Sequence, residues 1–409
     1  MKSLTERNSS IGLKLGPAPG MAEDVSLVRL ATLAWLVLLI VLVVKAGVSP
    51  EEHTTYPCFE AGTRCWWAGE NMYNPYVCQF DYRYTPVFAV LFTPFAWLPM
   101  WLGGMLWNVV NVGALFLALT RLLQHVFPEE WDDRRQGLYL SLVLVSSLRG
   151  LWASQTNSLI IALVALAAAA IAERRWWQAA FLLAGPVYIK LWPLAAALLM
   201  VACWPRRLGW KFAAALLLLG LLPFLTASPA AVWGHYRDWG QAVFGPMQIR
   251  HIYRDAWTIW EVASPPVSPE IYRYLQLGMA GLTLLLCLWQ RWWRQKPERQ
   301  VLTIVLGFWC VWQLVFGPGV ERNTICLIGP LIAWGVIAGW KQRWSGFVLA
   351  AYALLTLFSF GEFERMGLRI SPWFLTALPI GSLLFGVWLI LYCSLSSDDV
   401  RSPRAGLQQ

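Results

Sequence analysis

Charged side chains are scarce in this sequence. Asp, Glu, Lys and Arg make up 13% of its 409 residues, whereas hydrophobic residues make up 58%. Soluble domains average about 25% charged and about 45–50% apolar residues. The sequence also has only 4 histidines and 8 cysteines. This composition excludes a disordered chain, a small disulfide-stabilised toxin and an ordinary cytosolic enzyme, and it predicts an all-α polytopic integral membrane protein.

The sequence lacks the common nucleotide-binding and hydrolase motifs. It has no P-loop, no G-x-G-x-x-G after a predicted strand and no G-x-S-x-G. These absences argue against ATP-driven transport by this chain. No Cys/His spacing matches a zinc site, so we expect no metal. The net charge of +9 is spread over gaps between apolar runs, without a basic face interleaved with stacking aromatics, so we expect no nucleic-acid partner.

Long apolar runs dominate the rest of the sequence. A membrane span needs about 20 such residues. The runs are 27–46, 101–124, 137–148, 158–172, 178–203, 212–227, 272–290, 301–316, 324–340, 347–360 and 373–393. They predict about ten or eleven transmembrane helices, some short enough to be half-helices. The first run exceeds the roughly 7–15 residues of a signal-peptide core, which favours an uncleaved signal anchor over a cleavable signal peptide.

The positions of Lys and Arg predict the topology. Most lie in one alternate set of gaps, which includes both ends of the chain. Because positively charged segments stay in the cytoplasm, we expect cytoplasmic termini and a location in the inner (plasma) membrane. The predicted parts are a cytoplasmic segment 1–26, a transmembrane domain 27–393 and a polar cytoplasmic tail 394–409. Two long loops, 47–85 and 228–271, then face outwards.

The first outer loop combines carboxylates with aromatic rings. A carboxylate can take the proton from an attacking sugar hydroxyl, and aromatic rings stack on the faces of sugars. The alternative is a solvated acidic loop beside an interfacial belt of Trp and Tyr, which composition alone favours. The loop also has three cysteines, so at most one disulfide forms within it, in a compartment that permits one. These residues are Glu51, Glu52, Glu60, Glu70, Asp81, Tyr73, Tyr84, Cys58, Cys65 and Cys78.

Ionisable residues also lie in or beside the later apolar runs. Lys190 lies between two prolines, where a broken helix could line a cavity; the alternative is a short outer loop between two half-length helices. Gln155 and Asn157 follow a short apolar run. Glu321 and Arg322 lie between two runs, as binding residues or as a local ion pair in a tight turn.

The second outer loop is rich in charge and histidine. Its basic groups could hold a phosphate, or the loop could be an ordinary wet surface. Its charged residues and histidines include His235, Arg237, Asp238, Arg250, His251, Arg254, Asp255 and Glu261.

Six segments of the sequence follow one another in the order that is typical of a known family. They read WWAGENMY (66–73), DYRYTP (81–86), an apolar proline-containing stretch (87–99), LWN (106–108), ASQTNSL (153–159) and YIKLWP (188–193). In this order they resemble the family 87 glycosyltransferases of the GT-C type, bacterial membrane enzymes similar to polyprenol-phosphate-mannose-dependent α-1,2-mannosyltransferases. The resemblance covers roughly residues 27–340.

The resemblance implies a GT-C-like bundle whose first outer loop carries short helices on the membrane surface. The segment 86–100 suits one of them, because it is apolar, contains prolines and is too short to cross a bilayer. The resemblance also implies an active site at the outer membrane face. There a hexosyltransferase would move a sugar such as mannose from a polyprenyl-phosphate donor to a glycolipid or glycan acceptor, without a cofactor.

Two positions depart from the family pattern. Family members carry an aspartate early in the first outer loop as the general base, but residues 53–62 read HTTYPCFEAG. Glu60 could serve from a neighbouring position, with Asp81 and the other acids of the loop as alternatives. Ser154 stands where the family usually has Gly. A divergent subgroup, a different base or a lost activity would each explain these departures.

The expected mechanism assigns roles to these residues. An acceptor hydroxyl attacks the anomeric carbon while Glu60 or Asp81, the expected catalytic residues, takes its proton. Cations then neutralise the departing phosphate. The expected substrate-binding residues are Tyr73, Arg83, Tyr84, Gln155, Asn157, Lys190, His251, Glu321 and Arg322.

Two other functions fit parts of the sequence. A transporter or lipid flippase would explain Lys190 between prolines, which resembles the broken helices of such proteins. The lack of inverted repeats and the two large loops on one side argue against it. A catalytically inactive protein with a GT-C fold would explain the missing aspartate.

Overall fold

The computed structural model describes residues 26–52, 54–244, 254–263, 268–340 and 342–395, and these residues form helices and turns without a strand. The predicted cytoplasmic segment 1–26 and tail 394–409 lie almost entirely outside the described residues. The α-helices are α1 (Leu27–Val48), α2 (Tyr56–Ala68), α3 (Pro75–Cys78), α4 (Pro86–Ala96), α5 (Met100–Arg121), α6 (Asp133–Trp152), α7 (Asn157–Ala172), α8 (Trp176–Ile189), α9 (Leu194–Cys203), α10 (Trp210–Gly220), α11 (Pro229–Phe244), α12 (Ala256–Ala263), α13 (Pro269–Leu288), α14 (Glu298–Val315), α15 (Gly329–Gly339), α16 (Ser345–Ser359), α17 (Gly361–Leu368) and α18 (Ala377–Leu395).

Six short 3-10 or π-helical segments extend or connect these helices. They are η1 (Leu122–Val126), η2 (Pro205–Gly209), η3 (Leu222–Leu225), η4 (Trp289–Trp293), η5 (Arg322–Leu327) and η6 (Pro372–Thr376).

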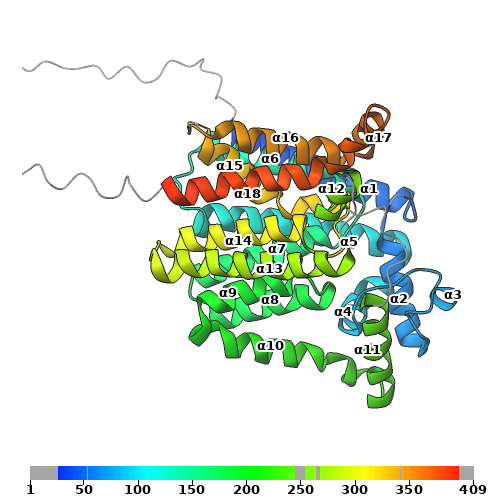
Figure 1. Cartoon of the computed structure of the whole chain (residues 1–409). Coiled ribbons are helices and arrows are strands. Elements are labelled where there is room, and N and C mark those ends of the chain that lie inside the picture. Colours follow the sequence, from blue (N-terminus) through cyan, green and yellow to red (C-terminus); the bar gives the residue numbers. More distant parts are fainter. Residues whose placement is uncertain (1–25, 53, 245–253, 264–267, 341, 396–409) are drawn as a thin grey trace, which may run out of the picture.

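The long helices lie side by side in a bundle, and short helices gather at one end of it (Figure 1). This end, which we call the loop end, carries α2, α3, α4, α11, α12 and α17. The two segments predicted to be long outer loops therefore fold largely into short helices. The described parts of both segments lie at the loop end, although about 140 residues separate the two segments in the sequence.

Contacts at both ends of α1 and α6 show the relative direction of these two helices. Ser26 accepts a hydrogen bond from the backbone of Arg29 at the start of α1, and its hydroxyl donates to Asp133 at the start of α6. Near the far ends of the two helices, Lys45 Nζ donates to the carbonyl of Trp152 at 2.7 Å. The two helices are thus parallel and both end at the loop end.

The outer surface of the bundle is apolar. Leu33 on α1, Leu217 on α10 and Leu285 on α13 expose 55%, 64% and 64% of their surface, and many other large hydrophobic side chains are exposed beside them. Contiguous apolar surface of this extent is disfavoured in water and favoured in lipid. In contrast, α7 lies in the interior, where its alanines allow close contact with α5 and α8.

Five helices are long and apolar enough to cross a membrane, and a sixth span results if the bent pair α16 and α17 is counted as one. The five are Leu27–Val48, Met100–Val126, Pro205–Leu225, Pro269–Trp293 and Pro372–Ser394. Other apolar helices, including α7 and α9, are shorter than the about 20 residues that a span needs. A multi-pass membrane protein is therefore supported, but the predicted count of ten or eleven spans is not confirmed.

Candidate functional site

The first loop is held to the bundle by a cluster of aromatic rings. Phe59 on α2 contacts Tyr84 with ring centroids 5.0 Å apart and Trp107 on α5 at 5.8 Å. Thr85 caps α4, because its hydroxyl oxygen accepts a hydrogen bond from the backbone of Phe88 at 3.2 Å. The same hydroxyl donates to the carbonyl of Tyr188 at the end of α8. These contacts place Tyr84 next to the turn that follows α8.

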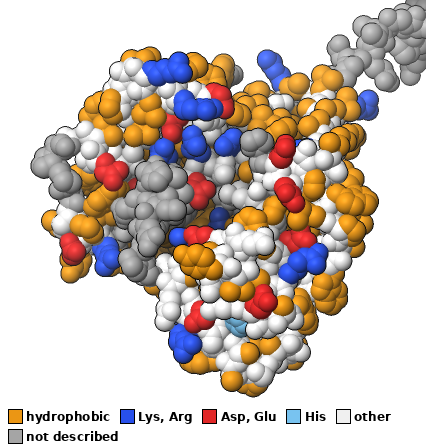
Figure 2. Space-filling view, turned by 90° about the vertical axis from the view of Figure 1, so that its right-hand side faces the viewer, with side chains coloured by type: hydrophobic (Ala, Val, Ile, Leu, Met, Phe, Trp, Pro, Cys, Tyr) orange, Lys and Arg blue, Asp and Glu red, His pale blue; other side chains and the backbone are white. Residues whose placement is uncertain are grey.

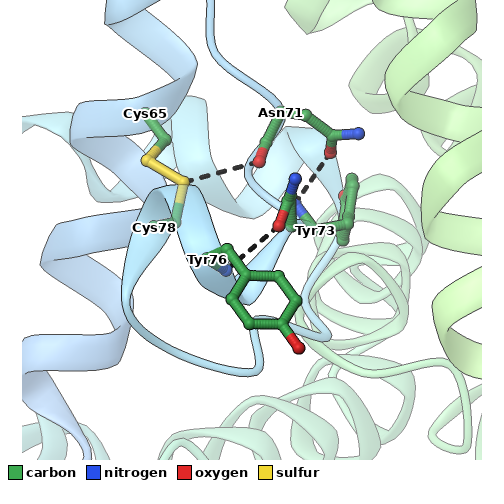
Figure 3. Close-up of a disulfide and its surroundings, with 6 residues drawn as sticks. Cys65, Asn71, Tyr73, Tyr76 and Cys78 are labelled. Carbon is green, nitrogen blue, oxygen red and sulfur yellow. Dashed lines mark hydrogen bonds between the residues drawn. A yellow bond between two sulfur atoms is a disulfide. The ribbon is translucent and has the colours of Figure 1, made fainter.

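A disulfide joins two parts of the first loop. Cys65 on α2 and Cys78 on α3 form it, with Cα atoms 6.3 Å apart (Figure 3). The enclosed segment is ordered by Asn71, whose side chain accepts a hydrogen bond from the backbone of Tyr73 at 2.9 Å and donates to Asp238 of α11 at 2.9 Å. The disulfide therefore stabilises the contact between the two predicted loops, and Cys58 remains a free thiol.

Tyr73 lies beside Tyr84 as part of this ordered segment. Its hydroxyl donates to the backbone carbonyl of Tyr84 at 2.9 Å. Its ring lies 6.0 Å from that of Tyr82 and 6.4 Å from that of His235 on α11. Burial raises the pKa of Tyr73 and of Tyr84, so both hydroxyls stay neutral and act as hydrogen-bonding groups.

Lys190 lies at the turn between α8 and α9. These helices are antiparallel, because Arg207 of η2, just after α9, lies over the ring of Trp176 at the start of α8. Lys190 Nζ donates a 2.9 Å hydrogen bond to Asn157 Oδ1 and lies 5.9 Å from the centroid of the Tyr84 ring. The backbone around Lys190 is therefore a short turn between two helices, as the short-loop alternative predicts. The side chain points to Asn157 and Tyr84, which are two of the expected binding residues.

The segment before α7 contains Ser154, one of the two positions that depart from the family pattern. Ser154 has φ 50°, in the left-handed region that favours glycine. Its hydroxyl donates to Asn108 Oδ1 at 3.1 Å, and its carbonyl accepts from Trp107 Nε1 at 2.9 Å. A serine is therefore accommodated where the family usually has Gly. The neighbouring Gln155 is buried, and its Oε1 has no hydrogen-bond partner among the described residues.

Glu321 completes the surroundings of Lys190. The carboxylate of Glu321 accepts a hydrogen bond from the backbone N–H of Thr324, and the hydroxyl of Thr324 accepts from the backbone N–H of Glu321 at 3.0 Å. The same carboxylate interacts electrostatically with Lys190 and with Tyr84. Lys190, Asn157, Tyr84 and Glu321 therefore form one polar cluster, which we call the lysine cluster.

Arg322 pairs with a residue that the sequence did not single out. Its Nη1 lies 3.6 Å from Oε1 of Glu364 on α17, whereas the expected alternative was a local pair with Glu321. Arg254 binds the same carboxylate at 2.7 Å. Arg254 was one of several charged residues noted in the second loop, but Glu364 had no sequence signal, because its partners lie 42 and 110 positions away.

The two expected catalytic acids occupy different surroundings. Glu60 is buried on α2 and pairs with Arg64 at 2.7 Å, one helical turn away. Asp81 is exposed and pairs with Arg83 at 2.7 Å. Burial raises the pKa of the Cys58 thiol to about 12, and the nearby charge of Asp81 adds to this shift.

Glu60 has one oxygen, Oε1, in the ion pair with Arg64, whereas its other oxygen, Oε2, is buried without a hydrogen-bond partner among the described residues. His251, the remaining expected binding residue, lies outside the described residues.

An apolar groove lies between α12, α13, the end of α14 and α18. It has a volume of about 310 Å³. Its lining comes from α12, α13, the end of α14 and α18, and consists of Ala256, Ile259, Trp260, Ala263, Leu275, Val315, Phe316 and Leu383. Ala256, the first lining residue of the groove, lies two residues after Arg254, which binds Glu364.

Figure 2 shows the loop end from outside. Lys and Arg side chains and Asp and Glu side chains gather around a hollow in the middle of this face, and hydrophobic side chains dominate its margins. A polar, mixed-charge recess with an apolar rim can hold an amphipathic ligand that carries a charged group.

The comparison with protein families agrees with this geometry. The model of glycosyltransferase family 87 matches residues 82–318, more than half of the chain. The matched segment contains Tyr84, Gln155, Asn157 and Lys190, and it ends just before Glu321. No curated protein matches the chain. The chain belongs to glycosyltransferase family 87 and is a multi-pass membrane glycosyltransferase.

Proposed function

We propose that this enzyme transfers a hexose, mannose by resemblance to its family, from a polyprenyl-phosphate sugar to a hydroxyl of a glycolipid or glycan acceptor. The observation that carries the proposal is the lysine cluster, in which Lys190 lies 2.9 Å from Asn157 and faces the ring of Tyr84. The cluster unites four sequence segments at one end of a membrane-embedded bundle. A cation supported in this way is suited to a phosphate group.

The chemistry proceeds by displacement at the anomeric carbon. The acceptor oxygen forms a bond to this carbon while the bond from the carbon to the phosphate oxygen breaks, and the polyprenyl phosphate leaves with the bonding electrons. Lys190 and Arg322 offset the negative charge that the phosphate gains. Because the phosphate link already activates the sugar, the proposal includes no nucleotide and no metal.

We assign the proton transfer to Asp81 rather than Glu60. Asp81 is exposed at the loop end, three residues before Tyr84, so that an acceptor hydroxyl can reach its carboxylate. Glu60 is buried against its own helix neighbour Arg64, which leaves little room for an acceptor. A general base must come within hydrogen-bond reach of the hydroxyl that it deprotonates.

Other groups near the lysine cluster suit a sugar. The rings of Tyr73 and Tyr84 offer surfaces for stacking. The buried Oε1 of Gln155 is an acceptor without a partner among the described residues, and a sugar hydroxyl would satisfy it. The apolar groove of about 310 Å³ supports a lipid-linked donor, because a polyprenyl chain can lie there while its phosphate reaches the adjacent arginines.

The proposed orientation places the loop end outside the plasma membrane, with both termini in the cytoplasm. The disulfide between Cys65 and Cys78 supports this orientation, since disulfides persist in oxidising compartments. The distribution of Lys and Arg supports it as well.

A transfer assay tests the proposal. Purified full-length enzyme in vesicles is given radiolabelled decaprenyl-phosphate mannose, decaprenyl-phosphate glucose or a nucleotide-activated mannose, together with a lipid extract as acceptor. We expect label to move to an acceptor from a polyprenyl-phosphate donor only, and to be lost in Lys190→Met. Transfer from the nucleotide sugar, or movement of the donor across the vesicle without transfer, would overturn the proposal.

A further inference from the structure

A buried carboxylate at the loop end holds two arginines from distant segments. Glu364 on α17 has a side chain that is only 4% exposed. It accepts hydrogen bonds from Arg254 Nε at 3.0 Å and Arg254 Nη2 at 2.7 Å. Arg322 Nη1 lies 3.6 Å from the same carboxylate. Since two guanidinium groups share one carboxylate, the three side chains together carry one excess positive charge.

The two arginines differ in their access to solvent. The side chain of Arg254 is 9% exposed, whereas that of Arg322 is 32% exposed. Arg254 binds the carboxylate through two donors, and Arg322 contacts it at longer range. Arg322 is therefore the guanidinium of this group that an anion from solvent can reach.

The backbone of α17 is shaped around Arg322. This helix turns by 95° from α16, so it does not continue along the axis of its predecessor. Its first residue is Gly361, where an added Cβ would lie 2.8 Å from Arg322 Nη1. The absence of a side chain at this position thus leaves the space that the guanidinium occupies.

From these contacts we infer that Glu364 is a positioning residue that fixes the guanidinium of Arg322 for the phosphate of the lipid-linked donor. Arg254 offsets the charge of the carboxylate, so that Arg322 remains available to an anion. The apolar groove, which starts two residues after Arg254, leads a lipid chain to this charge. The inference rests on the proposed function, and α17 lies outside the segment that matches the family.

Kinetics of the full-length enzyme test this role. Glu364→Gln removes the charge that holds Arg322, and Gly361→Ala displaces the guanidinium without changing any charge. We expect both variants to raise the KM for the polyprenyl-phosphate sugar about 10- to 100-fold, with the KM for the acceptor unchanged. Glu364→Asp restores part of the loss. In the background of Arg322→Ala, Glu364→Gln adds little, because its target is already gone.

Glu362→Gln is the matched control. Glu362 lies on the same helix, but its side chain is 65% exposed and pairs with Arg365 on the surface. If Glu364→Gln and Gly361→Ala fold and behave like this control, the inference is wrong. If Glu364→Gln fails to fold, Gly361→Ala and Glu364→Asp decide the question.

Binding without turnover separates this inference from the proposed function. Decaprenyl phosphate should raise the thermal midpoint of the wild type and of Glu362→Gln, but not of Gly361→Ala or Arg322→Ala, and decaprenol without phosphate should have a smaller effect on all of them. This pattern supports the inference even if the wild type transfers no sugar. Equal stabilisation of all variants by decaprenyl phosphate would overturn the inference while leaving glycosyl transfer intact.

Discussion

Lys190 at the turn after α8 donates a 2.9 Å hydrogen bond to Asn157, the first residue of α7. The contact joins two segments that lie 33 positions apart in the sequence. It orients the ammonium group towards the ring of Tyr84, whose centroid is 5.9 Å away. A cation oriented by a hydrogen bond and an aromatic ring loses little freedom when a phosphate binds, which is the condition for effective electrostatic stabilisation of a leaving group.

Replacement of this lysine should abolish most of the activity. We expect Lys190→Met to lower kcat by about 10²- to 10³-fold, because the departing phosphate loses a positioned positive charge. Transfer of label from a polyprenyl-phosphate sugar measures the effect. Lys211→Met is the control, since Lys211 lies over the ring of Trp210 and outside the site. Similar activity in both variants would contradict the role of Lys190.

The choice of base predicts a difference between two isosteric changes. We expect Asp81→Asn to lower kcat by about 10²- to 10⁴-fold and Glu60→Gln to lower it far less, because the exposed carboxylate of Asp81 is open to an acceptor hydroxyl and that of Glu60 is buried. Arg83→Met removes the same ion pair at 2.7 Å, and because Arg83 is an expected binding residue we expect it to raise the KM rather than to lower kcat. A large loss in Glu60→Gln with an active Asp81→Asn would assign the proton transfer to Glu60.

The disulfide should contribute to stability. A cross-link between Cys65 and Cys78, 13 positions apart, restricts the unfolded chain. The double variant Cys65→Ser/Cys78→Ser should therefore lower the free energy of unfolding by about 2–4 kcal/mol. Denaturant titration in detergent measures the change. Dithiothreitol should destabilise the wild type and leave the double variant unaffected; an equal response of the two proteins would show that the disulfide does not form.

Acid should destabilise the contact between the two loops through His235. Burial against Trp66 and Tyr73 lowers the pKa of His235, and the charge of Asp238 opposes this effect only in part. The unfolded chain therefore binds the proton more readily, so stability is fully present above the unfolded-state pKa of about 6.5 and is lost as the pH falls below that value through the lower folded-state pKa.

Thermal unfolding between pH 8 and pH 5 measures this dependence. We expect His235→Phe to keep the ring contacts with Trp66 and Tyr73 and to flatten the decline on the acidic side. If the variant and the wild type lose the same number of degrees over this range, another group causes the acid sensitivity.

The helices of the bundle were largely readable from the sequence. The apolar run 301–316 became α14 (Glu298–Val315), and the prolines around Lys190 marked the break between α8 and α9. The number of spans could not be predicted from the sequence. The length of an apolar run does not show whether its helix crosses the membrane, breaks, or ends inside the protein. Several runs form helices shorter than a bilayer requires.

The candidate site was readable only in part. Three of the expected binding residues belong to the short segments DYRYTP, ASQTNSL and YIKLWP, which can be recognised in the sequence. These residues are Tyr84, Asn157 and Lys190, and the structure brings them together. Glu364 was missed, because an isolated glutamate near the end of the chain has no local pattern. Its role depends on Arg254, which lies 110 positions earlier.

Composition and the spacing of apolar residues alone determined that this chain is helical and enters a membrane, since burial of apolar surface and satisfaction of backbone groups act locally along the chain. Only the tertiary structure decided which guanidinium groups share a carboxylate and which of the two candidate acids is buried. Electrostatic contacts depend on distances of a few ångströms between side chains, and folding sets these distances between segments that are remote in the sequence.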